Sequence, residues 1–156
     1  MKRFTVSAMG LIVLLMASGG IAHEFTLEQA MQAWSFLDGN WILTSPEGQT
    51  FDVTVHLAPT KTAYVSESVQ GLHIFGWDPK SRLLEIQSFM PDGTRASALY
   101  DRKSDKQLAG KETKLVNPDG AESTMQEAGV FSAIDKDTWH FAIGDATWVC
   151  KRKPRK

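Results

Sequence analysis

The sequence predicts an all-β protein: a barrel of about ten antiparallel strands with a short N-terminal helix. Three observations predict this fold. One amphipathic helical segment is followed at once by Gly39-Asn40-Trp41, and every later segment has the pattern of a short strand closed by a turn. Ten short antiparallel strands in a flat sheet would expose long edges, so we expect them to close into a barrel or to pack as two sheets.

The helix is predicted over residues 26–37. Leu27, Ala30, Met31 and Trp34 repeat at helical spacing, and the next turn brings further apolar residues. This spacing places them on one face of a helix, with Thr26 as a suitable N-cap. Asp38-Gly39 then ends the helix.

The strands follow at regular intervals, each bounded by Gly, Pro, Asp or Asn. The segment 50–57 alternates most clearly, with Phe51, Val53 and Val55 on one face. We expect a charged turn over 101–106 and a bend near Gly129 in one long strand. The predicted strands are 41–45, 50–57, 62–69, 72–77, 82–89, 94–100, 107–116, 121–134, 138–143 and 146–152.

Residues 1–22 are expected to be a cleavable signal peptide. Lys2 and Arg3 precede an apolar stretch from Val6 to Ala17, and Gly20-Ile21-Ala22 offers small residues for cleavage after Ala22. The apolar stretch is shorter than the roughly 20 residues that span a bilayer. We therefore expect a secreted or periplasmic protein whose residues 23–156 form one domain.

The charge pattern argues against nucleic-acid binding. Residues 23–150 hold 10 Lys and Arg residues and 18 Asp and Glu residues, a net charge of −8, whereas nucleic-acid binding needs a basic face. The tail 151–156 is basic and could contact anionic lipid or envelope polymer, or simply be a solvated end. Cys150 is the sole cysteine and lies in an apolar strand, so we expect a buried thiol and no internal disulfide.

These residues resemble the calycin superfamily, which includes lipocalins and fatty-acid-binding proteins. The resemblance rests on Gly39-Asn40-Trp41, on Ile74-Phe75-Gly76-Trp77-Asp78-Pro79, and on Phe131 and Asp137-Thr138-Trp139 before a basic terminus. It points more closely to poorly characterised secreted bacterial lipocalin-like proteins. It implies that Gly39 and Trp41 close one end of the barrel and that Lys151 or Arg152 packs across the indole ring, a structural role. The Arg-x-Tyr pair of fatty-acid-binding proteins is missing, so the resemblance does not imply a bound fatty acid.

Metal or catalytic chemistry has little support in the sequence. No histidine pair has ligand spacing, although an N-terminal His23 would be able to chelate copper together with a second histidine. No nucleophile motif is present, but a buried carboxylate in the barrel could serve as the base of an isomerase or lyase. We expect no metal and no cofactor.

Binding of a small apolar or amphipathic molecule is the function that the sequence favours. A barrel of this size can enclose one small ligand, and aromatic residues are plentiful. The alternatives are a barrel-interior enzyme and a filled barrel that binds a partner at the cell envelope. Candidate ligand contacts are His73, Arg95, Tyr100 and His140, together with Trp77, which could instead cap a hairpin.

Overall fold

The computed structural model describes residues 24–126 and 129–154. The predicted signal peptide, His23 and the last two residues of the basic tail lie outside the described residues. Within these ranges, no helix has the length and apolar composition needed to cross a membrane. The strands are β1 (Gly39–Thr44), β2 (Thr50–Leu57), β3 (Tyr64–Ser68), β4 (Gly71–Asp78), β5 (Leu83–Phe89), β6 (Arg95–Ser104), β7 (Gln107–Val116), β8 (Glu122–Met125), β9 (Val130–Asp135), β10 (Thr138–Ile143) and β11 (Ala146–Arg152).

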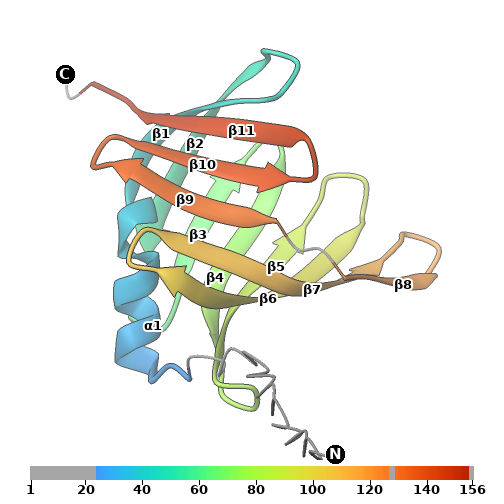
Figure 1. Ribbon diagram of the computed structural model, residues 1–156. Coiled ribbons are helices and arrows are strands. Elements are labelled where there is room, and N and C mark those ends of the chain that lie inside the picture. Colours follow the sequence, from blue (N-terminus) through green and yellow to red (C-terminus); the bar gives the residue numbers. More distant parts are fainter. Residues whose placement is uncertain (1–23, 127–128, 155–156) are drawn as a thin grey trace, which may run out of the picture.

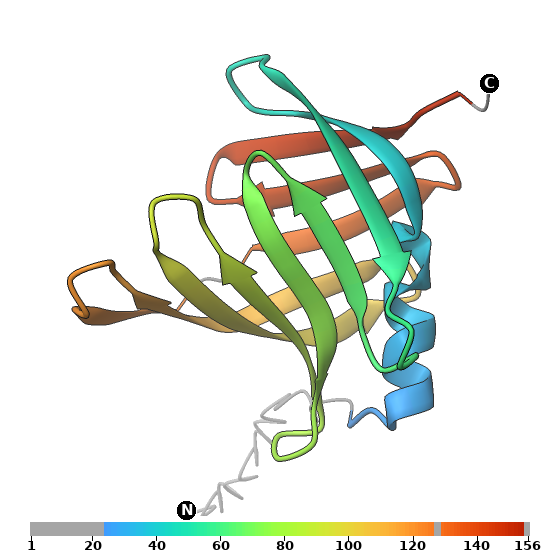
Figure 2. The same ribbon diagram turned by 180° about the vertical axis from the view of Figure 1, so that it is seen from behind.

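The predicted barrel is confirmed. Strands β1 to β7 pair in chain order, β7 pairs with β9, and β9, β10 and β11 lead back to β1, so ten antiparallel strands form a closed ring. β8 pairs only with the distal half of β7 and extends beyond the ring (Figures 1 and 2). Closure satisfies the hydrogen-bonding edges that an open sheet would leave exposed.

The predicted helix is also confirmed, as α1 (Leu27–Trp34) and a 3-10 turn η1 (Ser35–Leu37). Thr26 is its N-cap: its hydroxyl accepts from the Gln29 backbone N–H, and the Gln29 side chain accepts from the Thr26 N–H. This capping box satisfies two backbone donors that the first turn leaves unpaired. Ala30 and Trp34 are fully buried where the helix packs against one end of the barrel (Figure 1).

The single long strand predicted over 121–134 is wrong, because the structure divides it into β8 and β9. Gly129 lies at the division with φ +64°. A Cβ at this position would lie 2.6 Å from side-chain atoms of both Phe141 and Ile143. Glycine therefore lets the chain turn back into the barrel wall beside β10, while β8 continues outward with β7.

The predicted charged turn over 101–106 is also wrong in extent, since β6 continues to Ser104. Asp101 is 7% exposed and forms an ion pair with Lys111 on β7 at 3.4 Å. A cross-strand charge pair of this kind stabilises a sheet. Residues 101–104 therefore belong to β6, and the turn is confined to Asp105-Lys106.

Candidate functional site

A cavity of about 550 Å³ occupies the interior of the barrel. All ten barrel strands contribute to its wall, because alternate side chains of each strand point inward. Most lining groups are apolar, as in typical small-molecule sites. The large apolar residues of the wall are Leu43, Phe51, Val53, Val55, Phe75, Ile86, Leu115, Phe131, Trp139, Phe141, Ile143 and Trp148.

Aromatic rings form the floor of the cavity at the helix end. Trp34, fully buried, donates its indole N–H to the Gly76 carbonyl at 2.9 Å. Its ring centroid lies 5.3 Å from Phe75, 6.0 Å from Tyr100 and 5.8 Å from Phe131, in edge-to-face arrangements. Such arrangements are favourable for aromatic pairs. Trp34 of the helix therefore packs against these rings and closes the barrel at the helix end.

A row of polar side chains crosses the wall on three neighbouring strands. Ser66 on β3 pairs with His73 on β4, and His73 pairs with Ser88 on β5, so the three lie at one height. All three line the cavity. The Nδ1 atom of His73 lies 2.9 Å from the Ser88 hydroxyl oxygen, within hydrogen-bond distance. The interior thus combines mostly apolar walls with this hydrogen-bonding row. Further polar residues of the lining are Ser45, Gln49, Ser68, Gln70 and Thr113.

Burial controls the ionisation of the groups in the cavity. Desolvation lowers the pKa of His73 below its ordinary 6.5, which favours the neutral ring at pH 7. Desolvation also raises the pKa of the Tyr100 hydroxyl and of the Cys150 thiol, so both stay protonated. Cys150 is fully buried and lines the wall, as predicted for an unreactive thiol. Among the described lining residues, Glu47 in the exposed β1–β2 turn is the one that carries a charge.

The candidate contacts predicted from the sequence fall into two groups. His73 and Tyr100 line the cavity. His140 does not, because it lies between the inward Trp139 and Phe141 and points to the other side of the sheet. Arg95 is exposed and lies in a separate hollow of about 740 Å³ beside β5 to β8.

Trp77 lies below the cavity rather than in its wall. It is partly buried and packs against the core. Its indole nitrogen is buried and has no hydrogen-bond partner among the described residues. Trp77 therefore contributes to the closed end of the barrel and is not in a position to contact a molecule in the cavity.

Sequence reasoning missed Ser66 and Ser88. The signal was the alternation itself: Leu84, Ile86 and Ser88 share one face of β5, and Tyr64 and Ser66 share one face of β3. A serine at an apolar phase of a strand pattern marks an inward polar group. Both serines are buried, at 3% and 8% exposed.

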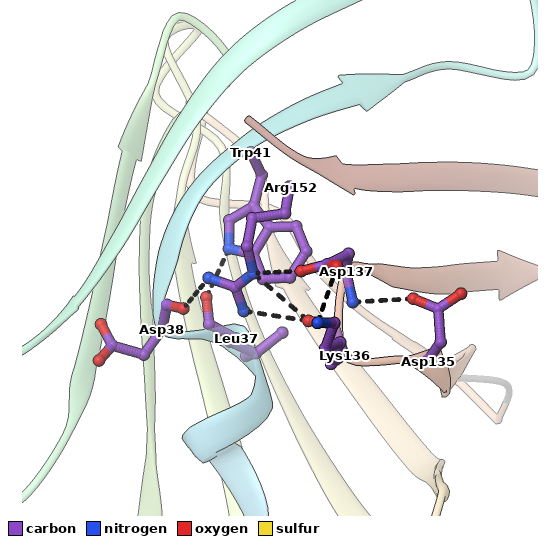
Figure 3. A network of polar contacts seen from close by, with 7 residues as sticks. All are labelled: Leu37, Asp38, Trp41, Asp135, Lys136, Asp137 and Arg152. Atoms are coloured by element: carbon purple, nitrogen blue, oxygen red, sulfur yellow. Dashed lines mark hydrogen bonds and ion pairs between the residues drawn. The ribbon is translucent and has the colours of Figure 1, made fainter. Parts of the chain in front are cut away.

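The predicted closure of the barrel is present at the helix end, with Arg152 as the cation (Figure 3). The Arg152 guanidinium lies 4.2 Å from the centre of the Trp41 ring, and Trp41 is 1% exposed. Lys151, the other candidate, is exposed. Gly39 has φ +136°, and a Cβ there would collide with the Arg152 side chain. The Gly-x-Trp motif and the last strand therefore form one structural unit.

The guanidinium also binds three backbone or side-chain acceptors. It donates to the Asp38 carbonyl at 2.9 Å and to the Lys136 carbonyl at 3.3 Å, and it forms an ion pair with Asp137 at 3.3 Å. These contacts connect η1, the β9–β10 turn and β11 (Figure 3).

The described residues contain no group of three or more His, Cys, Asp or Glu side chains that could hold a metal ion. Of the cavity-lining residues that the structure describes, Glu47 in the β1–β2 turn is the one acidic residue, and it is not part of the row that holds His73. The buried carboxylate that the sequence suggested as the base of a barrel-interior isomerase is therefore not seen in the wall that the structure describes.

Comparisons with known proteins add little to this geometry. No protein-family model matches the chain, and no curated protein matches it. Among solved structures, the chain is similar to a redesigned beta barrel at 16% sequence identity, with 78% of this chain and 96% of that chain covered and a TM-score of 0.34.

Proposed function

We propose that this protein binds a small apolar or amphipathic molecule inside the barrel and does so without catalysis. The observation that supports this function is the cavity of about 550 Å³, which has the size and apolar lining of small-molecule sites. A barrel filled with side chains, as expected for a purely structural envelope protein, would leave no such space.

We also propose that the chain is a distant calycin-like protein that acts outside the cytoplasm. The contact of Arg152 with Trp41, the glycine before it and the helix across the barrel end support the first point. The sequence of residues 1–22 supports the second. N-terminal sequencing of the exported protein tests the location, with His23 as the expected first residue.

Native mass spectrometry tests the binding function. We expect protein purified from its own source to carry a non-covalent small molecule, and we expect hydrophobic compounds to raise its melting temperature. Ala98 lines the wall, so Ala98→Phe should fill the cavity and abolish both effects. Ala142 alternates with two inward residues of β10 and so points outward, which makes Ala142→Phe the matched control. No bound molecule and no thermal shift with any hydrophobe would refute the proposal.

We propose separately that the basic tail contacts anionic envelope components. Arg152 belongs to the closure of the barrel, and Lys153 forms an ion pair with Asp52 at 2.7 Å. Deletion of residues 154–156 leaves the Arg152 contact with Trp41 and the Lys153–Asp52 ion pair in place. If the deleted chain binds anionic liposomes as well as the full chain does, the tail has no such role.

A further inference from the structure

Ser66, His73 and Ser88 form a hydrogen-bonding row in a wall that is otherwise mostly apolar. Only one bond joins its members, between His73 Nδ1 and the Ser88 hydroxyl. Since either atom can donate in that bond, the other ring nitrogen of His73 is able to present a donor or an acceptor to the cavity. The row therefore offers a bound molecule several uncharged hydrogen-bonding positions at one height.

Two hydroxyl-bearing residues of the lining are almost fully buried. Ser66 and Tyr100 are each 3% exposed, and both line the cavity. Buried polar groups in folded proteins nearly always have a partner. A bound molecule with a polar atom of its own would supply such a partner to the Ser66 and Tyr100 hydroxyls.

An anionic ligand would find no counter-charge in the part of this wall that the structure describes. Neither Lys nor Arg occurs among the described lining residues, and Glu47 in the β1–β2 turn would repel an anion. Burial holds the pKa of His73 below its ordinary value, so the ring does not supply a positive charge at neutral pH. An unpaired charge in an apolar environment is strongly unfavourable.

Building on the binding function proposed above, we propose that the cavity selects uncharged amphiphiles with a hydroxyl or carbonyl oxygen. That oxygen hydrogen-bonds to Ser66, His73 and Ser88, while the hydrocarbon part rests on the aromatic floor. Carboxylates of the same chain length are rejected because their charge would stay unpaired. Amines are rejected because the one negative charge of the described lining, on Glu47, lies in the exposed β1–β2 turn and not in the row.

Displacement of the neutral fluorescent probe N-phenyl-1-naphthylamine tests this selection. The full chain is loaded with the probe near pH 8, and decanol, decanoate and decylamine are compared as competitors of equal chain length. We expect decanol to displace the probe at a concentration at least about tenfold lower than either charged compound, since burial of an unpaired charge is disfavoured. If decanoate competes as well as decanol, the selection is refuted although the binding function stands. If the probe itself does not bind and no competitor raises the melting temperature, the binding function fails first.

Serine variants test the role of the row. Ser66→Ala and Ser88→Ala should each weaken decanol binding about threefold to tenfold, as expected for loss of a neutral hydrogen bond, and should leave binding of the apolar probe unchanged. Ser97 on β6 alternates with the inward Ala96 and Ala98, so Ser97→Ala is the matched outward control. If one serine variant fails to fold, the other still decides the point. Equal decanol affinity in a folded row variant and the Ser97 control would overturn the assignment.

Discussion

Removal of the Arg152 guanidinium should destabilise the barrel without emptying its core. In Arg152→Ala, the chain loses the cation over the Trp41 ring and the 2.9 Å bond to the Asp38 carbonyl. A cation–π contact contributes about 0.5–2 kcal/mol, and a hydrogen bond from a charged donor contributes about 1.5–3 kcal/mol. The bonds to Lys136 are long and the Asp137 carboxylate is half exposed, so they add little. We expect the free energy of unfolding to fall by about 2–4 kcal/mol.

Urea denaturation followed by circular dichroism measures this loss. Arg152→Lys keeps the charge but not the planar fork, so it should recover only part of the stability. Lys151 is the neighbouring exposed cation, and Lys151→Ala should change the free energy of unfolding by less than about 0.5 kcal/mol. If both alanine variants cost the same, or if Arg152→Ala costs less than about 1 kcal/mol, the contacts of Arg152 do not close the barrel as argued.

Three further predictions concern stability. Trp34→Ala should cost about 3–5 kcal/mol in urea denaturation, because a fully buried ring that also donates to Gly76 is removed, and a loss below about 1 kcal/mol would contradict its role as the floor. Folding lowers the pKa of His73, so the unfolded chain binds a proton at a higher pH than the folded chain does. The free energy of unfolding should therefore be at its full value above about pH 6.5 and decline below it. His73→Gln should remove this pH dependence if the histidine is the cause. Gly129→Ala should lower the melting temperature more than Gly48→Ala does. Both glycines have positive φ, but only at 129 would a Cβ meet other atoms, so equal losses would show that packing there is unimportant.

Much of the fold could be predicted from local patterns. The spacing of apolar residues in 26–37 and the alternation in 50–57 each report one buried face, and each matches an observed element. The wrong predictions over 101–106 and 121–134 arose where the local composition disagrees with the strand pairing. Asp101 looked like part of a turn, yet its partner Lys111 on the adjacent strand keeps it in the sheet. The division near Gly129 depends on its close approach to Phe141 and Ile143, which belong to β10 and not to the predicted strand 121–134.

The candidate site was harder to predict than the fold. His73 and Tyr100 were found because they are polar or amphipathic residues on strands. Arg95 and His140 were chosen for the same reason, but both flank inward residues and so belong to the opposite phase of their strands. The alternation of apolar and polar residues along each strand indicates which side chains point inward. This criterion separates His73 and Tyr100 from Arg95 and His140.

Local periodicity and turn chemistry were enough to predict the helix, most of the strands and the burial of Trp41. The choice of Arg152 rather than Lys151 as the residue that contacts that ring, and the row of Ser66, His73 and Ser88, follow only from the folded barrel. Both outcomes depend on the register between strands. Register is set by closure of the whole ring, since a shift of one residue would move every inward side chain to the outer face.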